Sequence, residues 1–242
     1  MFQQKGMRMR LIILSGGAAQ SVVTALAGEF RARTGYELDC TFSAVGEMKA
    51  RLLAGAAADL VILTHALIAE LAAGGRVLAD SCADLGRVRT GVAVRAGEPL
   101  PDIASASALR STLLAAEGIF IPDPIKATAG IHFARVLHAL GIHSEVVARL
   151  KTYPNGTTAM RELAQAKGAR LVGCTQVTEI NNTPGVVLAG LLPAEFELAT
   201  VYSAGVCAGT SSIDAARRFI ELLAGEGSRA LRLKAGFELG TA

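Results

Sequence analysis

The sequence predicts an α/β protein with two lobes. Short apolar runs alternate with helical patterns through the first 75 residues, which is typical of a parallel sheet with crossover helices. A Pro/Gly-rich turn at residues 97–101 interrupts this rhythm, and a second α/β series follows it. The chain ends with one strand and one helix, which cannot make a domain alone, so we expect them to return to the first lobe. These observations predict that residues 1–88 and 200–242 form one lobe and residues 89–199 the other.

In the first lobe we expect three strands, each followed by a helix. The strands are predicted at residues 10–14, 37–42 and 59–63, and the helices at 18–34, 45–54 and 66–73. Glycines follow each of these helices, at positions where glycine commonly ends a helix: Gly35, Gly55 and Gly74.

The second series predicts strands at residues 118–121, 170–174 and 186–188, and helices at 106–116, 130–140 and 157–166. The final strand is expected at residues 200–207. The final helix, at 212–224, is amphipathic, because one face carries Ile213, Ala216, Phe219, Ile220 and Leu223.

Composition excludes several classes of function. The 24 Lys and Arg residues nearly balance the 21 Asp and Glu residues, and no basic block is present, so we expect no nucleic-acid partner. Apolar residues never run uninterrupted for about 20 positions, so no membrane-spanning helix is predicted. The apolar run at residues 11–14 is too short for a secretory signal. As written, the chain is expected in the cytoplasm, or in the periplasm if the true start lies upstream.

Metal, redox and nucleotide chemistry find no support in the motifs. The four cysteines lie far apart without Cys-x-x-Cys spacing, so we expect buried, reduced thiols: Cys40, Cys82, Cys174 and Cys207. The four histidines form no His-Glu-x-x-His pattern, and Gly-x-Ser-x-Gly, phosphate-loop and Gly-x-Gly-x-x-Gly patterns are absent. We therefore predict no metal and no cofactor.

Small hydroxyl and glycine residues recur where strands or loops meet helices. Two such junctions fall in each predicted lobe, and their residues are Ser15, Gly16 and Gly17; Ser43; Thr128 and Ala129, with Lys126 nearby; and Gly156, Thr157 and Thr158. One such serine is ordinarily only a helix cap. Because ligands of open α/β sheets bind beyond the carboxyl ends of the strands, all four junctions are expected to meet at one crevice. Free N–H groups at helix N-termini favour a small anion there.

These motifs resemble those of the molybdate-binding-like solute-binding proteins of ABC importers. The resemblance runs from about Met9 to Phe237 and rests on Leu14-Ser-Gly-Gly-Ala18, Phe42-Ser-Ala-Val-Gly46, residues 54–62, Pro122-Asp-Pro with Ala129-Gly-Ile131, and Tyr202-Ser-Ala. It implies the type II periplasmic-binding-protein fold, with two α/β lobes and two hinge strands, for which residues 88–94 and 200–207 are the candidates. It also implies a monomer, and an importer permease as partner if the chain is exported.

The resemblance implies how the anion is held. In this family, two hydroxyls of the first lobe act with backbone amides and a tyrosine of the second. The serines correspond to Ser15 and Ser43, and the amides to Ala129 and residues 156–158. Gln176 takes the place of the tyrosine, which is a departure from molybdate binders. Lys49 and Lys126 are a second departure: they suit a di- or tricarboxylate, or else are solvated surface residues.

The family also contains an isomerase of aconitate, and the segment Gln176-Val-Thr-Glu179 resembles that branch. Moving a double bond in such an acid requires a base near the anion. The candidates are Glu179, Lys49, His132 and Tyr202. The alternatives are that Glu179 faces solvent, that His132 fills the face of its helix and that Tyr202 packs at the hinge. A ligand-sensing effector module is a further alternative, since the same fold serves that role in bacterial regulators.

Overall fold

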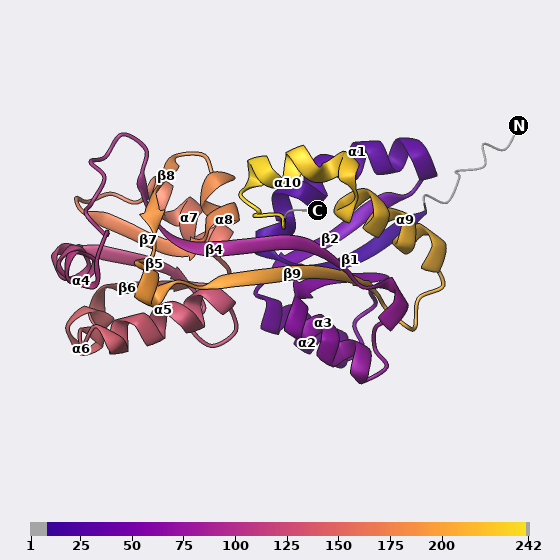
Figure 1. Cartoon of the computed structure of the whole chain (residues 1–242), viewed down its shortest axis with the longest axis horizontal. Helices are drawn as coiled ribbons and strands as arrows, with labels where there is room; N and C mark the ends of the chain where they lie inside the picture. Colours follow the sequence, from indigo (N-terminus) through magenta and orange to yellow (C-terminus); the bar gives the residue numbers. More distant parts are fainter. Residues whose placement is uncertain (1–8, 241–242) are drawn as a thin grey trace, which may run out of the picture.

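Two α/β lobes joined by two strands make up the computed structural model, which describes residues 9–240 (Figure 1). The predicted fold class is confirmed. The first lobe contains β1 (Arg10–Gly16), the 3₁₀ turn η1 (Gly17–Ala19), α1 (Gln20–Thr34), β2 (Glu37–Ser43), α2 (Val45–Leu53), β3 (Leu60–Thr64), α3 (His65–Ala73), η2 (Ala79–Ser81), α9 (Ile213–Ala224), η5 (Glu226–Ser228) and α10 (Arg229–Ala235).

The second lobe contains the remaining helices and four strands. Its elements are α4 (Ala106–Ala115), β5 (Gly118–Pro122), α5 (Thr128–Ala139), α6 (His143–Val146), η3 (Val147–Arg149), β6 (Leu150–Tyr153), α7 (Gly156–Gln165), β7 (Leu171–Gln176), α8 (Val177–Asn181), β8 (Val186–Leu191) and η4 (Ala194–Phe196). Strands β5 and β7 are buried along their whole length, as is β3 in the first lobe. Burial on both faces explains the apolar runs of β3 and β5, whereas β7 ends in the buried polar residues Thr175 and Gln176.

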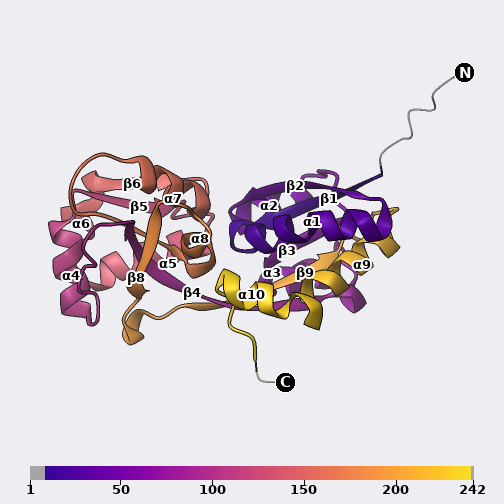
Figure 2. The ribbon, with the colours of Figure 1, turned by 90° about the horizontal axis from the view of Figure 1, so that it is seen from above.

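The lobes are connected by β4 (Ala83–Arg95) and β9 (Ala199–Val206), which run side by side between them (Figures 1 and 2). The strand order is β2-β1-β3-β9-β4-β7-β5-β6, with β8 paired to β4. The first half of β4 pairs with β9, whereas its second half pairs with β7 and β8. One strand therefore belongs to the sheets of both lobes. The exact lobe boundaries, predicted after residues 88 and 199, stay a prediction, because both strands run through them without a break.

The register of β4 against β9 shifts between Asp84 and Gly86. Gly86 has a φ of +134°, a backbone conformation that side-chain-bearing residues rarely adopt. This irregularity lies where the last residues of the described chain approach, since a Cβ atom at Gly86 would lie 2.6 Å from Leu239. The glycine therefore lets the chain end pass close to the connecting strand.

The predicted elements are present with shifted ends. Strand β1 continues two residues further than predicted, to Gly16, because the pairing with β2 extends to the contact between Gly16 and Ser43. Sequence patterns missed β6, α6, α8 and α10, which are at most seven residues long and carry too few apolar positions for a clear period. The expected burial of the four cysteines is confirmed for Cys174 and Cys207, whereas Cys40 on β2 is only half-buried and Cys82, at the turn between η2 and β4, is exposed.

The C-terminal segment returns to the first lobe, as expected. Helix α9 packs on α1, and Phe219 meets Phe30 edge to face with ring centroids 4.9 Å apart. Both rings are fully buried in the core of this lobe. The second lobe has separate apolar clusters, such as those around Phe133 and Phe120.

We expect Phe219→Ala to lower the free energy of unfolding by about 3–5 kcal/mol, because it empties a fully packed site. The control is Ile213→Ala on the same helix, where the side chain is exposed and the cost should be about 0.5 kcal/mol. Urea denaturation of both variants measures the difference. Equal costs would contradict the docking of α9 on α1.

Candidate functional site

A small cavity lies between the lobes, where strands from both end. Gly17 follows β1, Ser43 ends β2, Pro122 ends β5 and Gln176 ends β7. The cavity has a volume of about 20 Å³ and is lined by Gly17, Ala18, Ser43, Ala44, Val45, Pro122, Ala127, Thr128, Ala129, Asn155, Gly156, Gln176, Glu179 and Tyr202. The junctions predicted in each lobe thus contribute to one cavity.

The first lobe reaches the cavity through the starts of η1 and α2. Gly16 and Ser43 are partners across the parallel pair β1 and β2, so the two chain segments leave the sheet side by side. Gly17 faces the second lobe, and a Cβ atom there would collide with the Glu179 carboxylate. Glycine is therefore needed at this position for the close approach of the two lobes.

The second lobe contributes the N-termini of α5 and α7. Thr128 and Ala129 open α5, and Gly156 opens α7. Asn155 caps α7, since its Oδ1 accepts a hydrogen bond from the Thr158 N–H at 2.8 Å. Asn155 also lines the cavity and was missed by the sequence analysis, although the Asn-Gly-Thr-Thr sequence carries the signal of a helix cap.

Glu179 is buried in this site, with 6% of its surface exposed. The alternative that it faces solvent is therefore wrong, because the short helix α8 packs against α7 and η1. Burial raises the pKa of its carboxyl above the ordinary value, while the Thr175 hydroxyl, which donates to Oε2 at 2.5 Å, and nearby backbone N–H groups of α7 and of Gln176 act to lower the pKa. Glu179 thus remains a carboxyl with a raised pKa at the edge of the cavity.

Gln176 and Tyr202 complete the polar lining. Gln176 is 2% exposed, and neither its Oε1 nor its Nε2 has a hydrogen-bond partner in the described structure. Burial, followed by the charge of Glu179, raises the pKa of Tyr202 above its ordinary value, and the Gln176 side chain acts against this shift. Tyr202 is therefore a neutral phenol that lies beside the Gln176 amide.

The two lysines proposed for the site form ion pairs elsewhere. The Lys126 ammonium lies 3.0 Å from Glu47 Oε2, and the Lys126 carbonyl accepts the Gly46 N–H at 3.1 Å. These contacts bridge the lobes outside the cavity. Lys49 pairs with Glu70 at 2.6 Å. Neither lysine is among the residues that line the cavity.

Other predicted residues lie near the cavity without lining it. Ser15 is fully buried, and its hydroxyl donates to the Gly16 carbonyl at 2.9 Å. His132 Nε2 lies 2.7 Å from the Phe196 carbonyl oxygen, outside the cavity. Thr157 lines an adjacent hollow of about 300 Å³ that shares Gly17 and Glu179 with the cavity.

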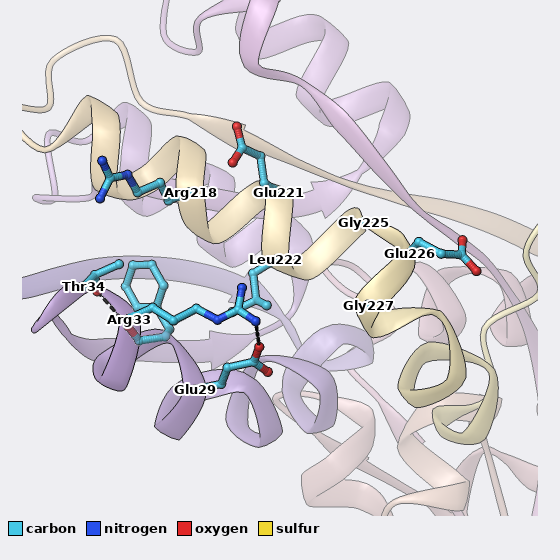
Figure 3. Close-up of a pocket in the computed structure, with 10 residues that line it drawn as sticks. Glu29, Arg33, Thr34, Arg218, Glu221, Leu222, Gly225, Glu226 and Gly227 are labelled. Atoms are coloured by element: carbon cyan, nitrogen blue, oxygen red, sulfur yellow. Dashed lines mark hydrogen bonds and ion pairs between the residues drawn. The ribbon is translucent and has the colours of Figure 1, made fainter.

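A further hollow of about 360 Å³ lies on the first lobe, between α1 and the segment from α9 to η5 (Figure 3). Its charged groups include the ion pair of Arg33 with Glu29. It is remote from the strand ends that form the cavity. Within residues 9–240, no group of three or more His, Cys, Asp or Glu side chains is arranged to hold a metal, and no helix is long and apolar enough to span a membrane.

We expect Gly156→Ala to destabilise the protein by roughly 1–3 kcal/mol, because the added Cβ would collide with Thr175 Oγ1 and the Glu179 carboxylate. The matched control is Gly28→Ala in α1, where no atom lies within 4 Å of the added Cβ and the fold should gain about 0.5–1 kcal/mol. Urea denaturation compares the two. A neutral Gly156→Ala would show that the carboxylate does not approach the start of α7 this closely.

Comparisons with known proteins place the chain in a family. An aconitate isomerase of a Pseudomonas species is 27% identical over 220 residues, which cover 88% of this chain and 82% of the relative. Among solved structures, the periplasmic molybdate-binding protein of Azotobacter vinelandii has a TM-score of 0.79 and 21% identity, covering 96% of this chain and 100% of that one. A sulfate-binding protein of Mycobacterium tuberculosis has a TM-score of 0.73 and 19% identity, covering 95% and 86%. The sequence profile of the family described as bacterial extracellular solute-binding protein matches residues 11–238, so the chain belongs to this family.

Proposed function

We propose that this protein binds a small anion, a molybdate-like oxyanion or a di- or tricarboxylate, in the cavity between its lobes. The observation that carries the proposal is the meeting of helix N-termini from both lobes at one buried space, beside the unpartnered amide of Gln176. Positive ends of helices favour negative charge, and fixed N–H and O–H dipoles can replace the hydration shell of an anion.

The relatives support an anion as ligand and leave its identity open. The similar structures include binders of molybdate and of sulfate, and the curated relative acts on aconitate by its name. A tricarboxylate is larger than a cavity of about 20 Å³. Its entry would require the lobes to separate about β4 and β9, with the contacts of Lys126 to Gly46 and Glu47 broken.

We expect at least one anion of a defined panel to raise the melting temperature. The panel contains molybdate, tungstate, sulfate, phosphate, citrate and both aconitates. A ligand present at 100 times its dissociation constant adds about 2.7 kcal/mol to stability. Ser43→Ala should weaken the binding roughly tenfold or more, because it removes a hydrogen bond to a charged ligand.

The control for this prediction is Ser111→Ala on the exposed face of α4, which should leave the ligand-induced shift unchanged. If no anion of the panel stabilises the protein, or if Ser43→Ala and Ser15→Ala both leave every shift as it was, the proposed anion site is wrong.

A second candidate function is the isomerisation of a tricarboxylic acid such as aconitate. The specific observation in its favour is that Glu179 and Tyr202, two of the four predicted proton-transfer candidates, both line the cavity. A carboxyl with a raised pKa suits general acid–base catalysis near neutral pH. The aconitate isomerase relative agrees with this role.

If this second function holds, the protein should interconvert cis- and trans-aconitate, and NMR in deuterated water would follow the isomers and any solvent deuterium they acquire. Glu179→Gln should lower the turnover by at least about 100-fold, the lower range for loss of a general acid or base. If the protein binds aconitate without interconverting its isomers, the isomerase function is wrong and the protein is a binding protein.

The partners follow from the family. A solute-binding protein hands its ligand to an ABC importer, and we propose such a permease as partner if the chain is exported to the periplasm.

A further inference from the structure

The cavity holds one carboxyl group and no positively charged side chain. Among the described residues that line it, Glu179 is the only acid, and none is Lys, Arg or His. An anion in this space would therefore lie beside a second potential negative charge with no ammonium or guanidinium group between them.

The elements packed against Glu179 bring few charged groups toward it. Helix α8 packs mainly against η1, β4, α7, β7 and β8, and the residues of η1, β7 and β8 include no charged side chain. The charged residues of β4 are engaged in ion pairs: its arginines with Glu98, Glu197 and Glu238, and Asp84 with His65. From β9, Tyr202 faces the carboxyl. From α7, Arg161 and Glu162 are exposed; Arg161 lines the adjacent hollow, which Glu179 also lines, and neither residue lines the cavity.

Two like charges in contact within a space shielded from water repel each other strongly, and the ordinary result is that the pair retains a proton. Two carboxylates that share a site behave in this way. Burial already favours the protonated form of Glu179 before any anion enters. Below the pKa of Glu179 in the protein without anion, the shared proton is therefore already present, and above that pKa it comes from solvent.

We propose that the bound anion and Glu179 share one proton, so that a fully ionised anion enters the cavity together with a proton from solvent. This inference rests on the proposed anion binding and adds to it a condition on the protonation state in which an anion binds. An anion that carries its own acidic proton supplies the shared proton itself. In either case the Gln176 amide can donate to the oxygens of the anion, because its N–H groups have no partner within the described structure.

The test is calorimetric titration of the intact protein with trans-aconitate and, separately, with molybdate, between pH 6 and 9 in buffers of different ionisation enthalpy. The number of protons taken up per anion should rise from near zero to about one as the pH passes the pKa that Glu179 has in the protein without anion. Above that pH the affinity should fall by about tenfold per pH unit.

Variants assign the proton to Glu179. Glu179→Gln should bind with little dependence on pH and with no proton uptake. Thr175→Val removes a hydroxyl that favours the ionised carboxylate, so the onset of pH dependence should move to higher pH while the uptake still reaches one proton. The control is Glu47→Gln at the rim: Lys126 and Arg51 lower the pKa of Glu47, so it stays ionised and the proton count should not change.

The outcomes separate the two proposals. If neither probe nor any other anion of the panel binds, the proposed function fails, and this inference fails with it. Tight binding of a fully ionised anion without proton uptake, at a pH at which Glu179 of the protein without anion has lost its proton, would overturn the shared proton alone. Uptake that persists in Glu179→Gln would also overturn it, because the proton would then reside elsewhere.

Discussion

The burial of the Glu179 carboxyl at the meeting point of the lobes is the constraint on which the surrounding structure depends. A charged or hydrogen-bonding group in such a place must find polar partners, and it finds the Thr175 hydroxyl and nearby backbone N–H groups of α7. Space for it exists only because Gly17 and Gly156 lack side chains. Gly17 and Gly156 therefore let the Glu179 carboxylate come close to the backbone, and they also form the starts of η1 and α7.

Charge is distributed differently inside and outside the cavity. The lining offers hydroxyls, amides and one carboxyl, whereas Lys126 and Lys49 lie outside it in ion pairs with Glu47 and Glu70. Neutral dipoles that are already fixed cost little reorganisation when an anion arrives. A lysine in the cavity would bind many anions through its charge alone. The described residues that line the cavity include no such group, so for the proposed anion shape and protonation become the basis of selection.

The two connecting strands determine how this lining can assemble. Strand β4 pairs with β9 in the first lobe and with β7 and β8 in the second, so the same strand fixes the place of the sheets of both lobes. Helix α9 packs on α1 through Phe30 and Phe219. The first lobe is therefore built from segments that lie far apart in the sequence. The rims meet through Lys126, whose backbone and side chain both contact α2.

The sequence by itself determined the lobes, most of the strands and helices, and the junctions at Ser43, Thr128 and Gly156, because hydrophobic period and cap residues are local signals. Only the tertiary structure decided which polar side chains share the cavity. Lys49 and Lys126 matched the pattern as well as Glu179 did, yet the lysines form ion pairs outside the cavity and Glu179 is buried. The direction of a side chain at the end of a strand or in a five-residue helix depends on what packs against it, and those neighbours come from distant parts of the chain.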